Sequence, residues 1–140
     1  MPILIDTNII LDVLTEDPLW ADWSDKAITE HQSKGLIVNS IIYSELCTGA
    51  ESRAEADEVI QSLKLSFEEI PRDALYLAAK AFLKYRRKGG TKISTLPDFF
   101  IGGHAEAIGV PIITRDTARY QSYFPNVTLI CPSPFDGRTV

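Results

Sequence analysis

The chain has 140 residues, of which 45% are hydrophobic and 24% are charged, and this ordinary composition argues against disorder, collagen-like repeats and coiled coil. A formal net charge of −5 argues against a protein that coats nucleic acid through bulk positive charge. No apolar stretch approaches the roughly 20 residues needed to cross a bilayer, and the N-terminus carries no secretory signal pattern. We therefore expect one domain over residues 1–140 in a cytoplasmic protein.

Short aliphatic runs rich in β-branched residues recur along the chain, and such runs suit strands that are buried on both faces of a parallel sheet. These runs are Ile3 to Ile5, Leu36 to Val38, Val110 to Ile113 and Val127 to Ile130, with a further possible strand at Phe67 to Ile70. Buried strands of this kind need helices on both faces of their sheet.

The stretches between the strands carry the start and stop signals of helices. After a first helix that follows Asp6-Thr7-Asn8, we expect helices from Pro18 to Lys34, from near Ser40, from Ser52 to Leu63, from Arg72 to Lys88, from Pro97 to Gly109 and, briefly, from near Thr117. Strands that alternate with helices predict an α/β fold with a mostly parallel sheet.

Four acids stand at the joints where predicted strands give way to helices, namely Asp6, Glu45, Asp98 and Asp116. Taken singly, the aspartates can cap a helix or turn and Glu45 can face solvent. Because the carboxyl ends of parallel strands meet at one edge of the sheet, the four acids are expected to share one crevice there.

Carboxylates that converge in this way repel one another and must either bind protons or share a cation. Oxygen ligands without a matching set of histidine and cysteine favour Mg²⁺ or Mn²⁺ over zinc. The chemistry that this predicts is hydrolysis of phosphodiester bonds by metal-activated water, with one or two ions.

With these acids in place, the chain resembles the PIN-domain ribonucleases, in particular the VapC-type toxins of type II (VapBC-like) toxin–antitoxin pairs. The resemblance rests on IDTN, NSIIYSEL, LPDFFIGGHA, IITRD and RYQSYFPNVTLICP, in this order along nearly the whole chain. It implies a three-layer fold and a Mg²⁺-dependent endoribonuclease. It also implies a cognate antitoxin that covers the crevice, and a homodimer.

The same resemblance assigns roles to single residues. Asp6 and Asp98 would be the principal metal ligands, while Glu45 and Asp116 complete the acidic cluster and position water. Asn8, Ser40 and Thr114 fall where the family places polar residues around the metal ligands, and they are assigned supporting roles. One departure is Gly102-Gly103, where the family usually has an alanine-rich helix. Close packing of this helix on the sheet is the favoured explanation, and proximity of the backbone to the metal cleft is the other.

A run of basic residues between Lys80 and Lys92 contains no acid. It can be a solvated helix end, or it can grip RNA phosphates at the rim of the crevice. In the second case the RNA-binding residues would be Arg86, Arg87, Lys88, Lys92 and Arg115. The tyrosines at positions 85, 120 and 123 would either stack on unpaired bases or pack as ordinary aromatics.

Several other residues have no firm role from the sequence. Cys47 and Cys131 are expected to be free thiols, and His104 an ordinary residue of the core or its edge. Trp20 and Trp23 offer apolar area either for an antitoxin or for the protein's own core.

Two alternative functions stay open. The same acids would serve a PIN-like nuclease in RNA processing or one that acts on DNA. A non-catalytic binding or phosphoacceptor module also presents an acid cluster at such a sheet edge. A phosphoacceptor would be expected to carry adjacent acids at the first strand and a lysine after a late strand, whereas this chain has Asp6 alone and Arg115.

Overall fold

A computed structural model of the chain describes residues 1–133, and it confirms the expected α/β fold with a parallel sheet between helices. Five strands pair in parallel in the order β3-β2-β1-β4-β5. They are β1 (Ile3–Ile5), β2 (Leu36–Val38), β3 (Leu65–Phe67), β4 (Ile112–Ile113) and β5 (Leu129–Ile130). All of β1, β2 and β4 is buried, as their unbroken aliphatic sequences predict.

Seven α-helices and one 3₁₀ turn connect or follow these strands within the described residues. They are α1 (Thr7–Leu14), α2 (Ala21–His31), the turn Gln32–Lys34, α3 (Ser40–Gly49), α4 (Arg53–Ser62), α5 (Arg72–Arg87), α6 (Pro97–Ile108) and α7 (Ala118–Tyr123). None of the helices within residues 1–133 is long and apolar enough to span a membrane.

Several boundaries differ from the prediction. Strands β4 and β5 each begin two residues later than expected, at Ile112 and Leu129, and α2 ends at His31, before the 3₁₀ turn. The third strand spans Leu65–Phe67 rather than Phe67 to Ile70, because Leu65 pairs with Leu36 of β2 and buries its side chain. The second helix begins at Ala21 rather than Pro18. Asp17 accepts hydrogen bonds from the backbone of Leu19 and Trp20 at 2.9 Å, but these bonds close a turn that precedes the helix.

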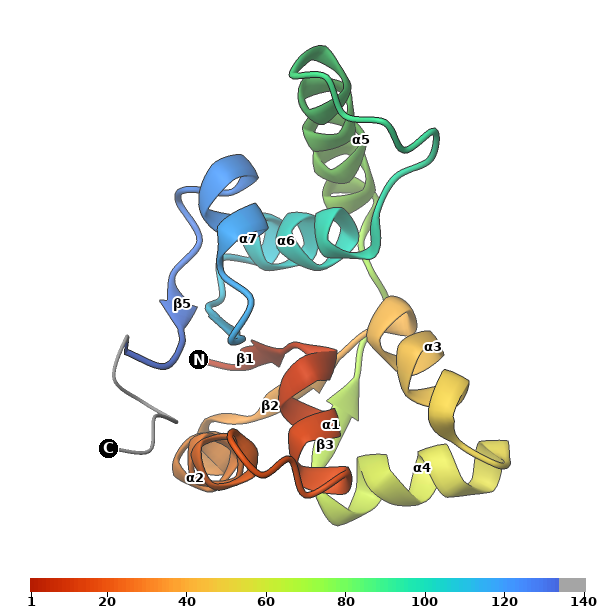
Figure 1. Ribbon diagram of the computed structural model, residues 1–140, viewed down its shortest axis with the longest axis vertical. Coiled ribbons are helices and arrows are strands. Elements are labelled where there is room, and N and C mark those ends of the chain that lie inside the picture. Colours follow the sequence, from red (N-terminus) through yellow and green to blue (C-terminus); the bar gives the residue numbers. More distant parts are fainter. Residues whose placement is uncertain (134–140) are drawn as a thin grey trace.

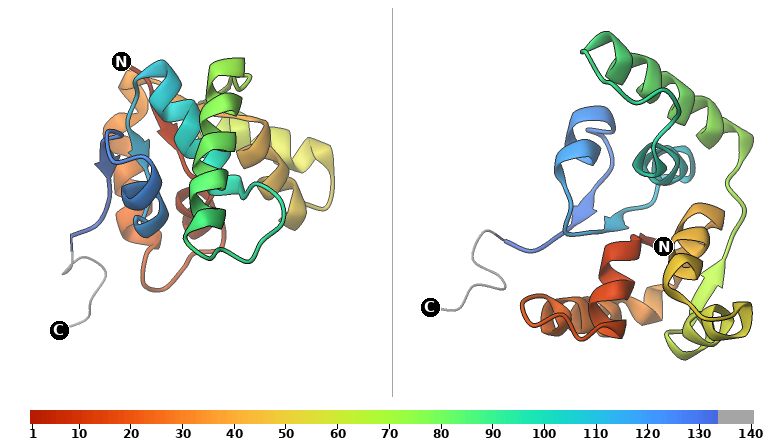
Figure 2. Two further views of the ribbon diagram at one scale, coloured as in Figure 1. Left: turned by 90° about the horizontal axis from the view of Figure 1, so that it is seen from above. Right: turned by 45° about the vertical axis from the view of Figure 1, so that its right-hand side comes forward.

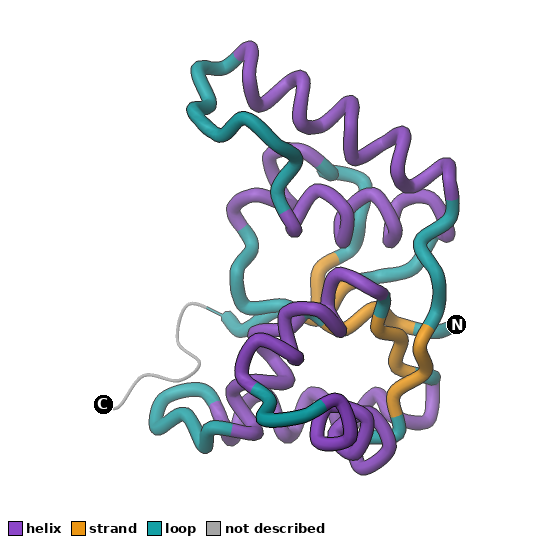
Figure 3. Tube along the Cα trace, turned by 90° about the vertical axis from the view of Figure 1, so that its right-hand side faces the viewer, coloured by secondary structure: helices purple, strands orange, loops and turns teal. Residues whose placement is uncertain are grey.

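The helices form two layers, one on each face of the sheet (Figure 1). Helices α5, α6 and α7 lie above the sheet in this view, and α1, α2 and α4 lie below it. Turned views show α5 and the loop that follows it reaching out beyond the rest of that layer (Figure 2), and the strands enclosed between the two groups of helices (Figure 3).

The strand order reverses its direction between β1 and β4. The chain passes from β1 to β2 and β3 in one direction, and then returns to add β4 on the other side of β1. Helices that follow β1 and β4 therefore leave the sheet on opposite faces. A crevice opens at the carboxyl ends of two neighbouring strands when the helices that follow them lie on opposite faces of the sheet.

Close packing between α5 and α6 explains the two glycines of α6. A Cβ atom on Gly103 would lie 2.6 Å from the carbonyl oxygen of Ala74 in α5, and a Cβ atom on Gly102 would lie 2.3 Å from the ring of Phe124. The glycines thus allow close packing, but against α5 and Phe124 rather than against the sheet as expected.

His104 belongs to the core. It is almost fully buried, and its Nδ1 lies 3.1 Å from the Nδ2 of Asn39. The side-chain oxygen of Asn39 accepts from the backbone of Ile41 and Ile42 and so caps α3. This fixes the Asn39 amide as the donor to His104. Burial lowers the pKa of His104, which agrees with a neutral ring.

Candidate active site

Asp6 lies at the carboxyl end of β1, and its carboxylate is buried under a set of hydrogen bonds. Its Oδ1 accepts from the backbone N–H of Thr7 at 2.8 Å, so Asp6 caps α1 as one of its two interpretations predicted. Its Oδ2 accepts from the hydroxyls of Thr114 and Tyr120, both at 2.9 Å. A weaker contact of 3.5 Å comes from the amide of Asn8.

The hydrogen bonds of Asp6 leave one of its two carboxylate oxygens able to accept a further partner. A carboxylate offers about two lone pairs per oxygen, and those of Oδ2 are taken by the two hydroxyls. Oδ1 has a single partner, the N–H of Thr7. Asp6 can therefore still accept a cation or a further donor through Oδ1.

Glu45 reaches the same place from α3. Its Oε1 accepts a hydrogen bond of 2.8 Å from the hydroxyl of Thr7, the residue next to Asp6. Glu45 is half-buried, so its position in the second turn of α3 turns the acid toward the sheet edge rather than into solvent.

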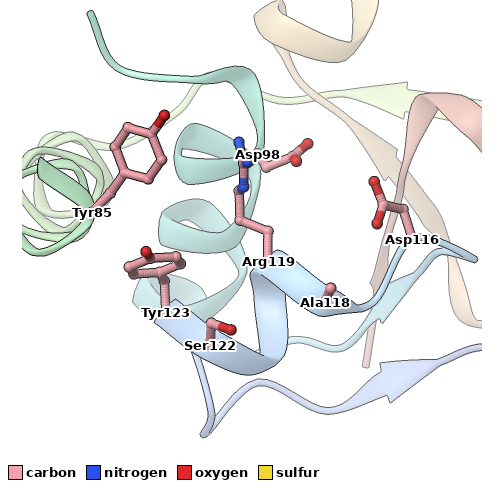
Figure 4. Close-up of a pocket in the computed structure, with 7 residues that line it drawn as sticks. All are labelled: Tyr85, Asp98, Asp116, Ala118, Arg119, Ser122 and Tyr123. Atoms are coloured by element: carbon pink, nitrogen blue, oxygen red, sulfur yellow. The ribbon is translucent and has the colours of Figure 1, made fainter. Parts of the chain in front are cut away.

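Asp98 and Asp116 face each other across a cleft of about 510 Å³ (Figure 4). Asp98 stands in the first turn of α6 and is half-buried, while Asp116 stands in the exposed turn between β4 and α7. The other residues that line the cleft are Tyr85, Ala118, Arg119, Ser122 and Tyr123.

The four acids influence one another electrostatically. The pKa of Asp98 is raised to about 6, mainly by burial and to a smaller extent by the charges of Asp6, Asp116 and Glu45. Burial also raises the pKa of Asp6, against the effect of its hydrogen bonds, and the charge of Glu45 adds to the rise. The structure thus brings together all four acids that the sequence singled out.

The donor set fits a hard cation that keeps part of its water shell. Within residues 1–133, no group of three or more His, Cys, Asp or Glu side chains is close enough to hold a metal ion directly. Mg²⁺ is commonly held by one or two carboxylates, with water completing its shell. Asp98 and Oδ1 of Asp6 suit that mode, whereas the cluster is too open for a cation that needs several direct carboxylates.

The three residues expected in supporting roles are placed differently from one another. Thr114 is fully buried and contacts both Asp6, through its hydroxyl, and the backbone N–H of Asp116 at 3.1 Å. Asn8 lies 3.3 Å from the Thr114 hydroxyl and accepts from the backbone of Arg115. Ser40 is exposed in the first turn of α3, and Asn39 beside it caps this helix.

Arg115 does not project into the cleft as a free cation, which corrects the expectation that it binds phosphate there. Its guanidinium makes two hydrogen bonds of 2.7 Å to the buried carboxylate of Asp12. It also lies over the ring of Trp20, 5.4 Å from the centroid. Asp12 in turn accepts from Ser24 at 2.7 Å. Arg115 therefore ties α1 and α2 to the turn that carries Asp116.

The basic run is exposed at the end of α5 and in the loop after it. Arg86 donates to the carbonyl oxygens of Gly90 and Lys92, so part of its role is to hold this loop. Lys88 extends toward the cleft, where its Nζ lies 5.1 Å from the ring centroid of Tyr123. Arg87 is exposed on the same turn of helix.

Two of the three tyrosines line the cleft, and the third does not. Tyr85 and Tyr123 form part of its wall. The idea that Tyr120 stacks on bases is wrong, because its ring is fully buried and its hydroxyl is bound to Asp6. Burial and the charge of Asp6 raise the pKa of Tyr120 well above its ordinary value, so it stays a proton donor.

Two residues of the site escaped the sequence analysis, Arg119 and Asp12. Arg119 lines the cleft beside Asp98, and its charge lowers the pKa of that acid in opposition to burial. Its four-residue spacing from Arg115 was a visible signal. Asp12 carries no local signal in the sequence that distinguishes it from any other polar residue of a helix.

The sequence matches the family model of the PIN domain over residues 3–124, and no curated protein was found to match it. Its fold is similar to a chain of the VapBC2 structure from Rickettsia felis bound to a DNA fragment from their promoter, with a TM-score of 0.73 and 17% identity over 95% of this chain and 100% of that one. A chain of VapBC-1 from nontypeable Haemophilus influenzae gives 0.70 and 20% identity over 94% and 98%. DNA-bound VapBC from Salmonella typhimurium gives 0.68 and 17% over 94% and 98%.

Proposed function

This chain belongs to the PIN domain family, and from that premise we propose that it is a metal-dependent endoribonuclease, the toxin of a VapBC-like toxin–antitoxin pair. PIN domains are generally nucleases, which makes hydrolysis of a phosphodiester bond the expected reaction. The four acids at the sheet edge are the groups that would perform it.

The observation that carries the proposal is the state of Asp98. Its carboxyl is raised to a pKa of about 6 by burial and by three other acids from separate segments of the chain. A structural cap would gain nothing from such crowding. A site that is completed by a divalent cation would, because the cation removes the repulsion.

Asp6 and Asp98 are the proposed metal ligands, with Glu45 and Asp116 completing the negative charge around them and orienting water. A bound divalent ion would lower the pKa of water and neutralise charge that develops at phosphorus. The hydroxyls of Thr114 and Tyr120 hold Oδ2 of Asp6 in place, so Oδ1 would be the oxygen available to a cation.

An antitoxin and a second copy of the chain are the proposed protein partners. Structures that share this fold across nearly its whole length include VapBC from Rickettsia felis, Haemophilus influenzae and Salmonella typhimurium. An uncontrolled ribonuclease would damage the cell that makes it, so the chain would require an inhibitor that covers the cleft.

The test is a cleavage assay on RNA and DNA of matched sequence, with Mg²⁺, with Mn²⁺ and with chelator. We expect cutting of RNA only when a divalent ion is present, and no cutting by Asp6→Asn or Asp98→Asn. Asp25→Asn is the matched control, since it makes the same change at an exposed acid of α2.

Each alternative function predicts a different result. A nuclease that acts on DNA would cut the DNA strand, and a non-catalytic module would cut neither. Activity that persists in chelator, or in both aspartate variants while they stay folded by circular dichroism, would falsify the proposal. Sequencing of RNA ends after controlled expression would then identify the RNA that is cut.

A further inference from the structure

Two arginines, Arg115 and Arg119, lie near the acids, and the partners of their guanidinium groups differ. Arg115 is paired with Asp12. Arg119 forms no salt bridge with a carboxylate anywhere in residues 1–133. Its guanidinium lies instead over two aromatic rings, 5.6 Å from the centroid of Tyr85 and 5.7 Å from that of Phe99. Arg119 therefore retains its positive charge toward the cleft.

Aromatic support leaves the hydrogen-bonding edge of Arg119 free. A ring attracts the guanidinium through its face, so the N–H donors stay directed outward. Figure 4 shows the guanidinium rising from α7 to the level of the Asp98 carboxylate. A planar fork of donors held in this way matches the oxygens of a phosphate.

Arg119 is also the one cationic side chain among those that line the cleft. A phosphate that approaches Asp98 and Asp116 meets two negative charges, so it needs a fixed positive charge on its other side. Arg119 supplies this charge beside Asp98.

Besides Arg119, a second positive charge, that of Lys88, lies close to Tyr123. Tyr123 follows on the same short helix, and the Nζ of Lys88 lies 5.1 Å from its ring centroid. The loop after Lys88 is held in place, because the backbone N–H of Lys92 donates to the hydroxyl of Tyr85. Gly90 passes so close to the Tyr85 ring that a Cβ atom there would lie 2.3 Å from it. One ring therefore supports both Arg119 and the basic loop.

We propose that Arg119 binds the phosphate adjoining the scissile bond in an unpaired nucleotide strand, which leaves the cleft across Tyr123 toward Lys88. The identity of the strand as RNA rests on the proposed function. A cleft of about 510 Å³ has the size of a small-molecule site, so we expect it to take one unpaired nucleotide rather than a base-paired stem.

The test is RNA binding in chelator, where no cleavage interferes. Fluorescence anisotropy of a labelled single-stranded oligonucleotide gives Kd at several salt concentrations. For Arg119→Gln we expect affinity to fall about tenfold and the slope of log Kd against log salt to fall by about 0.7, the loss of one phosphate contact. Arg119→Lys should keep the slope, and a hairpin of equal composition should bind more weakly than the single strand.

Arg72→Gln is the matched control. It removes the same charged group at the exposed start of α5, about 20 Å along that helix from Tyr85. We expect it to change neither the affinity nor the slope. Tyr85→Leu removes the ring beneath Arg119 without a change in charge, so affinity should fall while the slope stays.

The proposal is overturned if the wild-type protein does not bind the single strand, or if Arg119→Gln matches the wild type in affinity and slope. It is also overturned if Arg72→Gln loses as much as Arg119→Gln. Binding that depends on Arg119 without cleavage in Mg²⁺ or Mn²⁺ would uphold this subsite and overturn the nuclease function instead.

Discussion

The hydroxyl of Tyr120 donates a 2.9 Å hydrogen bond to Oδ2 of Asp6, across 114 positions of the chain. Both side chains are buried, and the contact joins α7 to the end of β1. A tyrosine buried among carboxylates thus serves to hold one of them in a fixed orientation. When a metal-binding carboxylate loses such a hydrogen-bond partner, metal affinity or activity commonly falls by about 10- to 100-fold.

Tyr120→Phe is therefore expected to reduce cleavage about tenfold or more and to weaken binding of Mn²⁺, while the ring still fills its place in the core. Cleavage rates and calorimetric titration with Mn²⁺ measure the two effects. Tyr76→Phe, at an exposed position of α5, is the control and should change neither. If the two variants have the same cleavage rate and the same affinity for Mn²⁺, the hydroxyl of Tyr120 has no part in the site.

Asp98 makes metal-free stability depend on pH. Its pKa in the folded protein, about 6, lies above the ordinary value of 3.8, so between these values the folded state holds the proton more tightly than the unfolded state. The free energy of unfolding should then fall as pH rises through this window. The Asp98→Asn variant has no carboxyl group at this position, so its free energy of unfolding should not show this decrease.

We expect Asp98→Asn in chelator to be more stable than the wild type at pH 7, by on the order of 1 kcal/mol after allowance for solvent screening. The difference should vanish as pH falls toward 4. Urea denaturation at intervals across this range measures it. A variant that is less stable than the wild type at pH 7 would contradict the assigned cause, which is burial of the charged carboxylate.

Gly103→Ala is expected to destabilise the protein by about 1 to 3 kcal/mol, because its Cβ would press on the backbone of Ala74 and force α5 away from α6. Gly49→Ala is the control. Nothing lies within 4 Å of a Cβ there, at the end of α3, so alanine should be neutral or slightly stabilising. Thermal melts of the two variants decide the matter.

Removal of Arg115 and removal of Asp12 should lower the stability of the protein by different amounts. Arg115→Met leaves the buried carboxylate of Asp12 with Ser24 alone and should cost about 3 kcal/mol of stability. Asp12→Asn should cost less, because 29% of the Arg115 side chain is exposed and water can solvate the guanidinium. Urea denaturation midpoints of the two variants measure the order, and the reverse order would contradict this account.

Much of the fold could be predicted from local signals. The aliphatic runs at Ile3 to Ile5 and Leu36 to Val38 gave two strands with correct ends. Ser52 caps α4 through its side chain, and Gly109 ends α6 in the left-handed conformation. Each of these signals acts over a few residues, so the sequence displays it directly.

The side-chain partners inside the site could not be predicted in this way. Arg115 was assigned to the rim because it is next to Asp116, yet its partner Asp12 is 103 positions away. For Tyr120 the sequence left base stacking and ordinary packing open, and only the structure shows that its ring is buried and its hydroxyl is bound to Asp6. Such pairings depend on three-dimensional approach, which spacing along the chain does not record.

The strand order has a consequence for the timing of synthesis. Asp6 leaves the ribosome 108 residues before Thr114 and 114 residues before Tyr120, and these partners reach it only when β4 pairs with β1. At rates of about 5 to 20 residues per second, several seconds of translation separate the two halves. A nascent chain that has not yet passed Tyr120 therefore carries an incomplete cleft, and any inhibitor has that interval in which to be made.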